Sequence, residues 1–278
     1  MIVDLHTHSN VSDGALPPAE LVRLAHANGV TLMSLTDHDT MDGIHAAHRE
    51  ADALGMGFIP GVEISSRWGG RTIHIVGLGL DSENAGVDEF FRDVCLKRDR
   101  RGRLIAEKFD AMGIHGAYEG ALALAGNKDN LSRTHFANWL HENGHVETYQ
   151  DAFDKYLKAG RPCCVEVDWP EVAAAVRFIR DQNGIAVLAH PGRYRFTEDW
   201  MIGALMEDFK KAGGEAIEVC SGSQTADDDV RFAQAAREMD FLASTGSDWH
   251  SLRSSRPTPG TQPQLPKDLK PVWQYLRW

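Results

Sequence analysis

MIVDLHTH, residues 1–8, opens the chain and is the stretch that decides the fold. An apolar, β-branched run typical of a buried strand comes first, and His6 and His8 close it. Side chains two residues apart on a strand point to the same face. Parallel strands of an α/β barrel end at one rim, where such folds carry their chemistry. The opening stretch therefore predicts two metal ligands at the rim of a barrel.

Histidines and carboxylates recur at the ends of later apolar runs, in LTDHD, PGVE, VLAHPG and GSDWH, and one histidine lies inside the run TIHIVG. The candidate ligands are His6, His8, Asp13, His38, Glu63, His74, His190, Asp248 and His250. Imidazole and carboxylate together suit Mn²⁺, Fe²⁺ or Zn²⁺, and the absence of thiolates from the set disfavours structural zinc. We therefore expect a divalent-metal site with several ions, able to activate water and hold phosphoryl oxygens.

Strand and helix patterns alternate through the first 80 residues and again after residue 165. Gly69-Gly70 predicts a tight hairpin between two neighbouring strands, which makes this pair antiparallel. No convincing strand pattern occurs between residues 81 and 165, where a long helical pattern over 87–112 is followed by shorter ones. We expect an α/β fold, a distorted (β/α)₇ barrel built from residues 1–100 and 166–278. A helical insertion domain, residues 101–165, is expected to form a lid over the active site.

The composition limits the partners of the protein. A formal charge of −11 argues against binding long nucleic acids on a basic surface, but it allows a small anion where metal ions reverse the local sign. We expect no signal peptide and no membrane span. The four cysteines form no C-x-x-C pair, which suits reduced thiols. The expectation is a cytoplasmic protein with no evident protein partner.

The motifs DLHTH, TDHD, AHPG and GSDWH resemble those of the PHP (polymerase and histidinol phosphatase) family of metal-dependent phosphoesterases. The resemblance covers nearly the whole chain and implies a distorted (β/α)₇ barrel with up to three metal ions. Manganese is the expected ion, with iron or zinc as alternatives. By position, one metal set comprises His6, His8, Glu63 and Asp248. A second set shares Glu63 and adds His74 and His190, and a third comprises Asp13, His38 and His250.

The stand-alone bacterial members of the family, the TrpH-like group, are similar in carrying a helical insert before AHPG. This resemblance implies a small nucleotide substrate: hydrolysis of the 3′-phosphate of nucleoside 3′,5′-bisphosphates, or trimming of short 5′-phosphorylated RNA from the 5′ end. The stretch LSRTHFANWL resembles the insert motif of that group, so Arg133 and His135 are candidate phosphate contacts, and Ser132 is expected to cap a helix. Arg193 is another candidate, because guanidinium binds phosphate in a bidentate manner. A metal-bound hydroxide held by Glu63, Asp248 and His190 is expected to attack phosphorus.

Three questions stay open at this point. The acid that protonates the leaving group is Asp37, His135 or a metal-bound water. An amidohydrolase that cleaves C–N bonds also begins with His-x-His, although His38 and Asp13 fit it poorly. A non-catalytic module that senses metal or nucleotide is the alternative outside enzymes.

Two further motifs are interpreted as structural. His141-Glu-Asn-Gly-His145 matches the H-E-x-x-H pattern of zinc proteases, but Gly144 is typical of a helix end, which would separate the two histidines. The basic run Lys97–Arg103 is expected to be the solvated face of a helix rather than a nucleic-acid contact.

Overall fold

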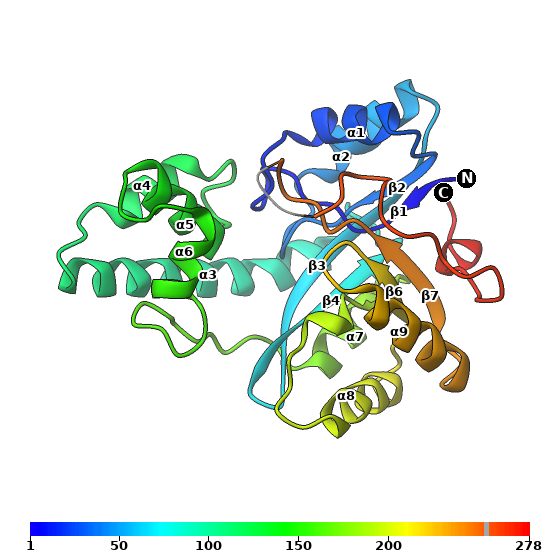
Figure 1. Cartoon of the computed structure of the whole chain (residues 1–278). Helices are drawn as coiled ribbons and strands as arrows, with labels where there is room; N and C mark the ends of the chain where they lie inside the picture. The colour runs from blue at the N-terminus through cyan, green and yellow to red at the C-terminus, as the bar shows by residue number, and fades with distance from the viewer. Residues whose placement is uncertain (253–255) are drawn as a thin grey trace.

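The computed structural model describes residues 1–252 and 256–278, and in these residues seven strands form one sheet in sequence order (Figure 1). The strands are β1 (Val3–Asp4), β2 (Leu32–Leu35), β3 (Gly57–Trp68), β4 (Arg71–Leu78), β5 (Ile185–Leu188), β6 (Ala216–Ser221) and β7 (Leu242–Gly246). The first and last strands meet through a backbone hydrogen bond from Leu5 N to Thr245 O, 3.0 Å long. The predicted distorted (β/α)₇ barrel is confirmed.

Strand β4 runs against its neighbours. It pairs with β3 and β5 in antiparallel fashion, whereas the other pairs of the sheet are parallel. The hairpin between β3 and β4 turns at Gly69 and Gly70, whose positive φ angles of 56° and 74° favour glycine. Because β4 is reversed, its beginning lies at the rim where the parallel strands end. His74, the fourth residue of β4, reaches the rim for this reason.

Helices cover the outside of the barrel (Figure 1). They are α1 (Pro18–Ala27), α2 (Ile44–Ala53), α7 (Val172–Asp181), α8 (Trp200–Lys211) and α9 (Ala226–Glu238), with short 3-10 segments at Pro191–Arg193 and Val272–Tyr275. Alternate side chains of a strand face opposite sides, so Ala186 and Leu188 of β5 join the cluster that packs against the helices, and Ile185 and Val187 join a second cluster. The sheet is therefore buried on both faces.

The remaining helices stand beside the barrel (Figure 1). They are α3 (Ala85–Ala111), α4 (Ala117–Leu124), α5 (Arg133–Glu142), α6 (Tyr149–Ala152) and a π-helical turn at Phe153–Leu157. Their hydrophobic cluster includes Phe109, whereas Val87 and Phe91 at the other end of α3 belong to the main core of the barrel. Helix α3 runs without a break through residue 101, so both bodies share it, and the domain boundary there stays a prediction.

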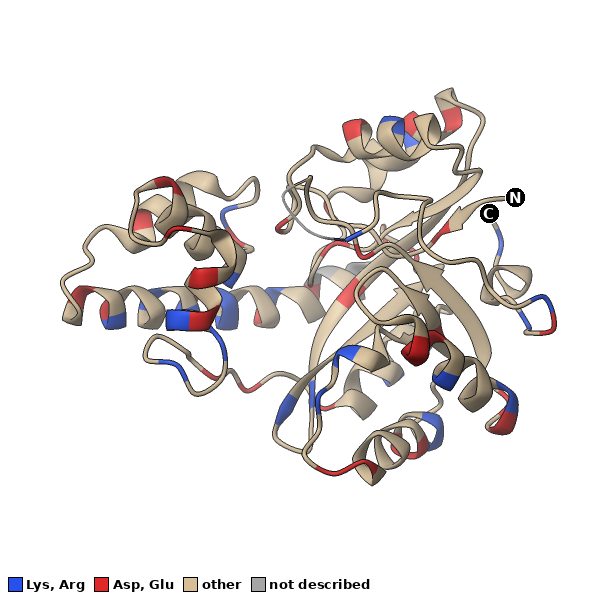
Figure 2. Ribbon diagram, viewed as in Figure 1, with Lys and Arg blue, Asp and Glu red and all other residues tan. Residues whose placement is uncertain are grey.

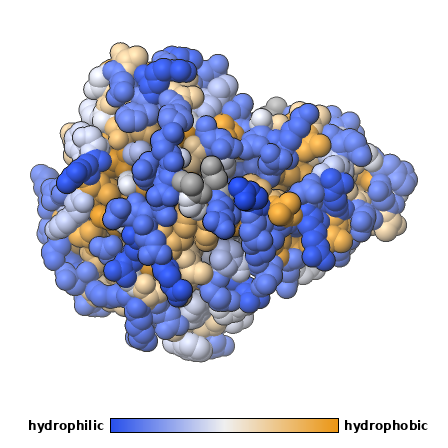
Figure 3. Space-filling model, turned by 180° about the vertical axis from the view of Figure 1, so that it is seen from behind, coloured by the Kyte–Doolittle hydropathy of each residue, from blue (hydrophilic) through white to orange (hydrophobic). Residues whose placement is uncertain are grey.

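The rear face of the molecule is mainly polar (Figure 3). In the view from behind, hydrophilic side chains cover most of the face, and apolar ones show only in small patches (Figure 3). Among residues 1–252 and 256–278, no helix has the length and apolar character needed to cross a membrane.

Replacing Phe109 with alanine tests the insert core. Phe109 is fully buried and lies 6.3 Å from the Phe136 ring, so Phe109→Ala leaves a cavity and should lower the free energy of unfolding of the insert by about 3–5 kcal/mol. Urea denaturation followed by circular dichroism measures the change. Leu104→Ala, on the same helix at 37% exposure, is the control and should have a much smaller effect. Equal effects of the two substitutions would contradict this packing.

Candidate metal centre

The strand ends bring all nine candidate ligands together at one rim. His6 and His8 follow β1, His38 follows β2, and Glu63 lies within β3. Asp248 follows β7 with a positive φ of 50°, a backbone conformation that concentrates at functional sites. His74, His190, Asp13 and His250 join the same network of close contacts.

Four buried side chains form the first group, His6, His8, Glu63 and Asp248. Glu63 Oε2 lies 3.3 Å from His6 Nε2 and 3.2 Å from His8 Nε2, and Asp248 Oδ1 lies 3.3 Å from His8 Nε2. His6 Nε2, His8 Nε2 and Glu63 Oε2 have no hydrogen-bond partner among the described residues, while Asp248 Oδ1 also faces Arg256. Buried polar atoms without partners are costly, and several of them converging on one point fit a divalent cation.

A second group lies beside the first and shares His8 with it: His8, Asp13, His38 and His250. Asp13 Oδ1 is 3.3 Å from His250 Nε2 and 3.8 Å from His38 Nε2. This oxygen is again buried without a hydrogen-bond partner in the described chain. The donor set and the orphaned oxygen fit a second cation.

The third group consists of His38, Glu63 and His74. The resemblance placed His190 with Glu63 and His74, and the structure puts His190 Nε2 2.9 Å from Glu63 Oε1, the oxygen that lies 2.8 Å from His74 Nδ1. His38 Nδ1 is 3.0 Å from the other oxygen of Glu63. Glu63 therefore contacts histidines through both oxygens, which suits a carboxylate that bridges ions.

The electrostatics keep the carboxylates ionised. Burial alone would raise the pKa of Glu63, but His74, His38 and His6 outweigh it and hold that pKa well below its usual value. Burial likewise opposes ionisation of Asp248, yet Arg256 and His6 keep its pKa well below the ordinary value. Both groups therefore present the charged form that binds metal.

Glu218 is a functional residue that the sequence analysis missed. It lies buried on β6, where Oε1 is 3.0 Å from His6 Nδ1 and Oε2 accepts a hydrogen bond of 2.6 Å from His190 N. A carboxylate behind a ligating histidine fixes the ring orientation and raises its basicity. A lone acidic residue inside the buried strand AIEVCS was the available signal.

Two arginines flank Asp248. Arg193 Nη1 lies 3.1 Å from Asp248 Oδ2, and Arg256 Nη1 lies 2.8 Å from Oδ1. The Arg193 side chain is 38% exposed, so it lies both at the metal centre and at the surface. The sequence analysis named Arg193 as a phosphate contact, a role that stays a prediction, and it did not name Arg256, which stands in a proline-rich tail without a motif.

The other two candidate phosphate contacts lie at the start of α5. Ser132 caps this helix, as predicted: its hydroxyl accepts from Thr134 N, and His135 Nδ1 accepts a 3.0 Å hydrogen bond from Ser132 N. Burial lowers the pKa of the His135 ring. Arg133 is partly enclosed, and burial lowers its pKa, while its Nη1 donates to Leu157 O at 3.4 Å.

Asp37, a candidate for the leaving-group acid, binds serine side chains. Its oxygens accept hydrogen bonds of 2.6 Å each from the hydroxyls of Ser9 and Ser12. Burial raises the pKa of Asp37 to about 6. In this arrangement Asp37 holds the loop before Asp13 in place.

The expectation for the basic run of α3 was wrong at two positions. Arg98 and Arg101 are only 3% and 8% exposed, and their guanidinium groups stack on the Trp169 ring at 5.5 and 5.4 Å. Arg98 Nε donates a 2.8 Å hydrogen bond to Asp39, so a buried ion pair joins α3 to the residue after His38. Basic residues occur along the middle of α3 (Figure 2).

The H-E-x-x-H match is not a metal site in the structure. Helix α5 ends at Glu142, Gly144 has a positive φ of 74°, and His145 lies outside the helix with its ring 5.2 Å from Trp139. The prediction that the helix stops before His145 is confirmed.

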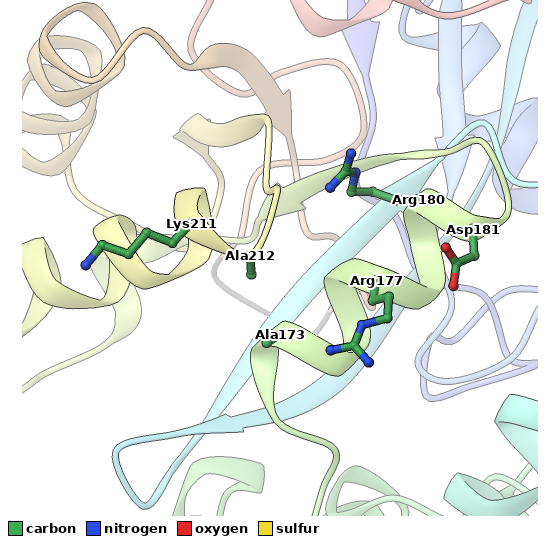
Figure 4. A pocket seen from close by; sticks show the side chains of 6 residues that line it. All are labelled: Ala173, Arg177, Arg180, Asp181, Lys211 and Ala212. Atoms are coloured by element: carbon green, nitrogen blue, oxygen red, sulfur yellow. The ribbon is translucent and has the colours of Figure 1, made fainter.

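A separate cleft of about 480 Å³ lies between α7 and α8 (Figure 4). Its lining is mainly charged, with Arg177, Arg180, Asp181 and Lys211. None of the nine candidate ligands borders it. The cleft is therefore distinct from the metal centre.

Comparisons with known proteins agree with this site. A family model described as the PHP domain matches residues 4–168. A 3′,5′-nucleoside bisphosphate phosphatase from Chromobacterium violaceum is 39% identical over 274 residues, covering 99% of this chain and 96% of that protein. A 5′-3′ exoribonuclease from Haemophilus influenzae is 40% identical over 247 residues, covering 89% of each.

A solved structure from Chromobacterium violaceum, described as an amidohydrolase with bound sulfate and no metal, has a TM-score of 0.94 at 39% identity. It covers 99% of this chain and 95% of that one. The chain belongs to the PHP domain family. The prediction of a metal-dependent phosphoesterase is confirmed.

The Arg98–Asp39 pair predicts a stability effect. Arg98→Met leaves the buried Asp39 carboxylate without its partner and should lower the free energy of unfolding by about 3–5 kcal/mol, as for other buried ion pairs broken on one side. Chemical denaturation is the measurement. Arg100→Met, at an exposed position two residues away, should change stability by at most about 0.5 kcal/mol. A neutral Arg98→Met would refute the role given to this pair.

Glu218 predicts an effect on metal affinity. Glu218→Gln removes the charge behind His6 and should weaken Mn²⁺ binding about 10- to 100-fold, measured by calorimetric titration. Glu215→Gln, at an exposed position before the same strand, should bind Mn²⁺ like the unchanged protein. Unchanged affinity in Glu218→Gln would show that His6 needs no support from this carboxylate.

Proposed function

We propose that this enzyme hydrolyses a phosphomonoester of a small nucleotide, namely the 3′-phosphate of nucleoside 3′,5′-bisphosphates such as 3′-phosphoadenosine 5′-phosphate. The observation that carries the proposal is the cluster of three adjoining metal-type groups, two of which share Glu63, with Arg193 at their edge. The similarity to a nucleoside bisphosphate phosphatase over 99% of the chain supports it.

The residues fit divalent ions, and we infer up to three per chain, with Mn²⁺ as the expected ion and Fe²⁺ or Zn²⁺ as alternatives. When bound, such ions would supply an activated water for in-line attack on phosphorus and would polarise the phosphoryl oxygens. His6, His8 and Asp248 would hold one ion, and Asp13, His38 and His250 another. His74 and His190 would complete the third through Glu63, which also serves the first.

The chain itself would bind and orient the phosphate groups. Arg193 offers a guanidinium at the edge of the metal groups, and Arg133 offers a second one on the insert. Planar guanidinium groups match phosphate oxygens in pairs. His135 would act indirectly, because its ring nitrogen caps the helical turn that begins with Arg133. The insert would serve as a lid that limits the site to ligands of nucleotide size.

A second candidate function is 5′-3′ cleavage of short 5′-phosphorylated RNA. The similarity to exoribonucleases of comparable identity supports it, and the same metal groups could serve phosphodiester hydrolysis. The formal charge of −11 disfavours long polymers in either case. We propose a cytoplasmic location, in line with four cysteines that form no disulfide.

One assay separates these candidates. Metal-defined protein is incubated with 3′-phosphoadenosine 5′-phosphate, with a short 5′-phosphorylated RNA and with a panel of amides. Phosphate release from the bisphosphate supports the proposal, and nucleotide release from RNA alone would replace it with the exoribonuclease. Hydrolysis of amides alone would favour an amidohydrolase, while nucleotide binding without any turnover would favour a sensing module.

Substitutions at the metal centre test the role of its ligands. His6→Ala or Asp248→Ala should reduce phosphate release to background, because each removes a donor from the first group. His141→Ala, in the discounted H-E-x-x-H match, is the control and should retain activity. Activity near that of the unchanged enzyme in His6→Ala and Asp248→Ala would overturn the metal assignment.

A further inference from the structure

The helical insert contacts the group formed by Asp13, His38 and His250 directly. Thr134 Oγ1, on α5, donates a 2.8 Å hydrogen bond to Asp13 Oδ2, and Ser132 Oγ lies 3.3 Å from the same oxygen. The Asn130 side chain donates to the backbone carbonyl of His38. Asp13 and His38 are thus held from outside the barrel, by the start of α5 and the residues before it.

The two oxygens of Asp13 have different environments. Oδ2 is held by the hydroxyls of the insert, whereas Oδ1 faces His250 and His38 and is buried without a hydrogen-bond partner in the described chain. A hydrogen bond to one oxygen fixes the plane of a carboxylate and so aims the other. Outer contacts of this kind orient metal ligands and commonly change metal affinity about 10- to 100-fold when they are removed.

We propose that Thr134 is a positioning residue for the metal centre: it holds Asp13 so that Oδ1 points at His38 and His250. The insert would then be part of the metal-binding structure and not solely a cover for the substrate. This inference rests on the proposed metal binding, and it holds for either nucleotide substrate. Thr134 does not support the other metal groups. Loss of its hydroxyl should therefore weaken the binding of one class of ion and leave the others unchanged.

Two substitutions of Thr134 separate the role of its hydroxyl from the role of its shape. Thr134→Val keeps the shape and the β-branched side chain but loses the hydroxyl, whereas Thr134→Ser keeps the hydroxyl. Thr148→Val removes another hydroxyl from the insert, one that accepts from Asp151 N. Asp13→Ala identifies which class of ion belongs to the group.

The full-length protein is freed of metal and titrated with Mn²⁺ alone, and stoichiometry and affinity are followed by calorimetry and electron paramagnetic resonance. We expect Thr134→Val to weaken one class of Mn²⁺ about tenfold or more, the same class that Asp13→Ala loses. Thr134→Ser and Thr148→Val should bind like the unchanged protein. Combining Thr134→Val with Asp13→Ala should cause no further loss, because the two residues act through one contact.

Three outcomes would overturn the inference. One is unchanged Mn²⁺ binding by Thr134→Val, and another is equal weakening of every class, which indicates general destabilisation. The third is an equal loss in Thr148→Val. The unchanged protein reports on the proposed metal chemistry separately: if it binds no Mn²⁺, that proposal fails before any variant is compared, and the role of Thr134 fails with it.

Discussion

One buried carboxylate, that of Glu63, is the constraint on which the site depends. It is in contact with five histidines that arrive from four strands, and a negative charge enclosed to this degree is tolerable only with cationic partners. The barrel resolves this requirement geometrically, because its strands end at one rim around β3. The reversed β4 adds His74 from the opposite direction, so Glu63 is approached from both sides. Fold and chemistry are therefore inseparable here, since the strand directions determine which histidines can reach the carboxylate.

Much of this arrangement could be predicted from the chain alone. His6 and His8 were predictable because two-residue spacing at the end of an apolar run places both on one face. The direction of β4 followed from Gly69-Gly70. Glu218, by contrast, gains its role from the placement of β6 near His6, which depends on tertiary contacts that lie 212 residues apart in sequence.

The wrong expectation for Arg98 and Arg101 also comes from tertiary contacts that the local sequence does not show. Helical periodicity shows that Arg98 and Arg101 lie close to each other on α3, but it cannot show that Trp169 covers them. A basic run on a helix is usually solvated, and this one departs from that pattern because Asp39 supplies a buried counter-charge. Arg256 was missed for a different reason: it reaches Asp248 from a tail in which no local pattern marks a contact.

The unbroken course of α3 has a mechanical consequence. A helix of 27 residues is roughly 40 Å long and bends little, so it behaves as a rod shared by the barrel and the insert. The barrel end of this rod is fixed by Val87 and Phe91 in the core, and Arg98 ties its middle to the loop after His38. Helix α3 therefore offers no hinge between the barrel and the insert. Opening of the candidate metal centre would have to come from displacement of the shorter helices over the rod, while the rod keeps its place beside the loop after His38.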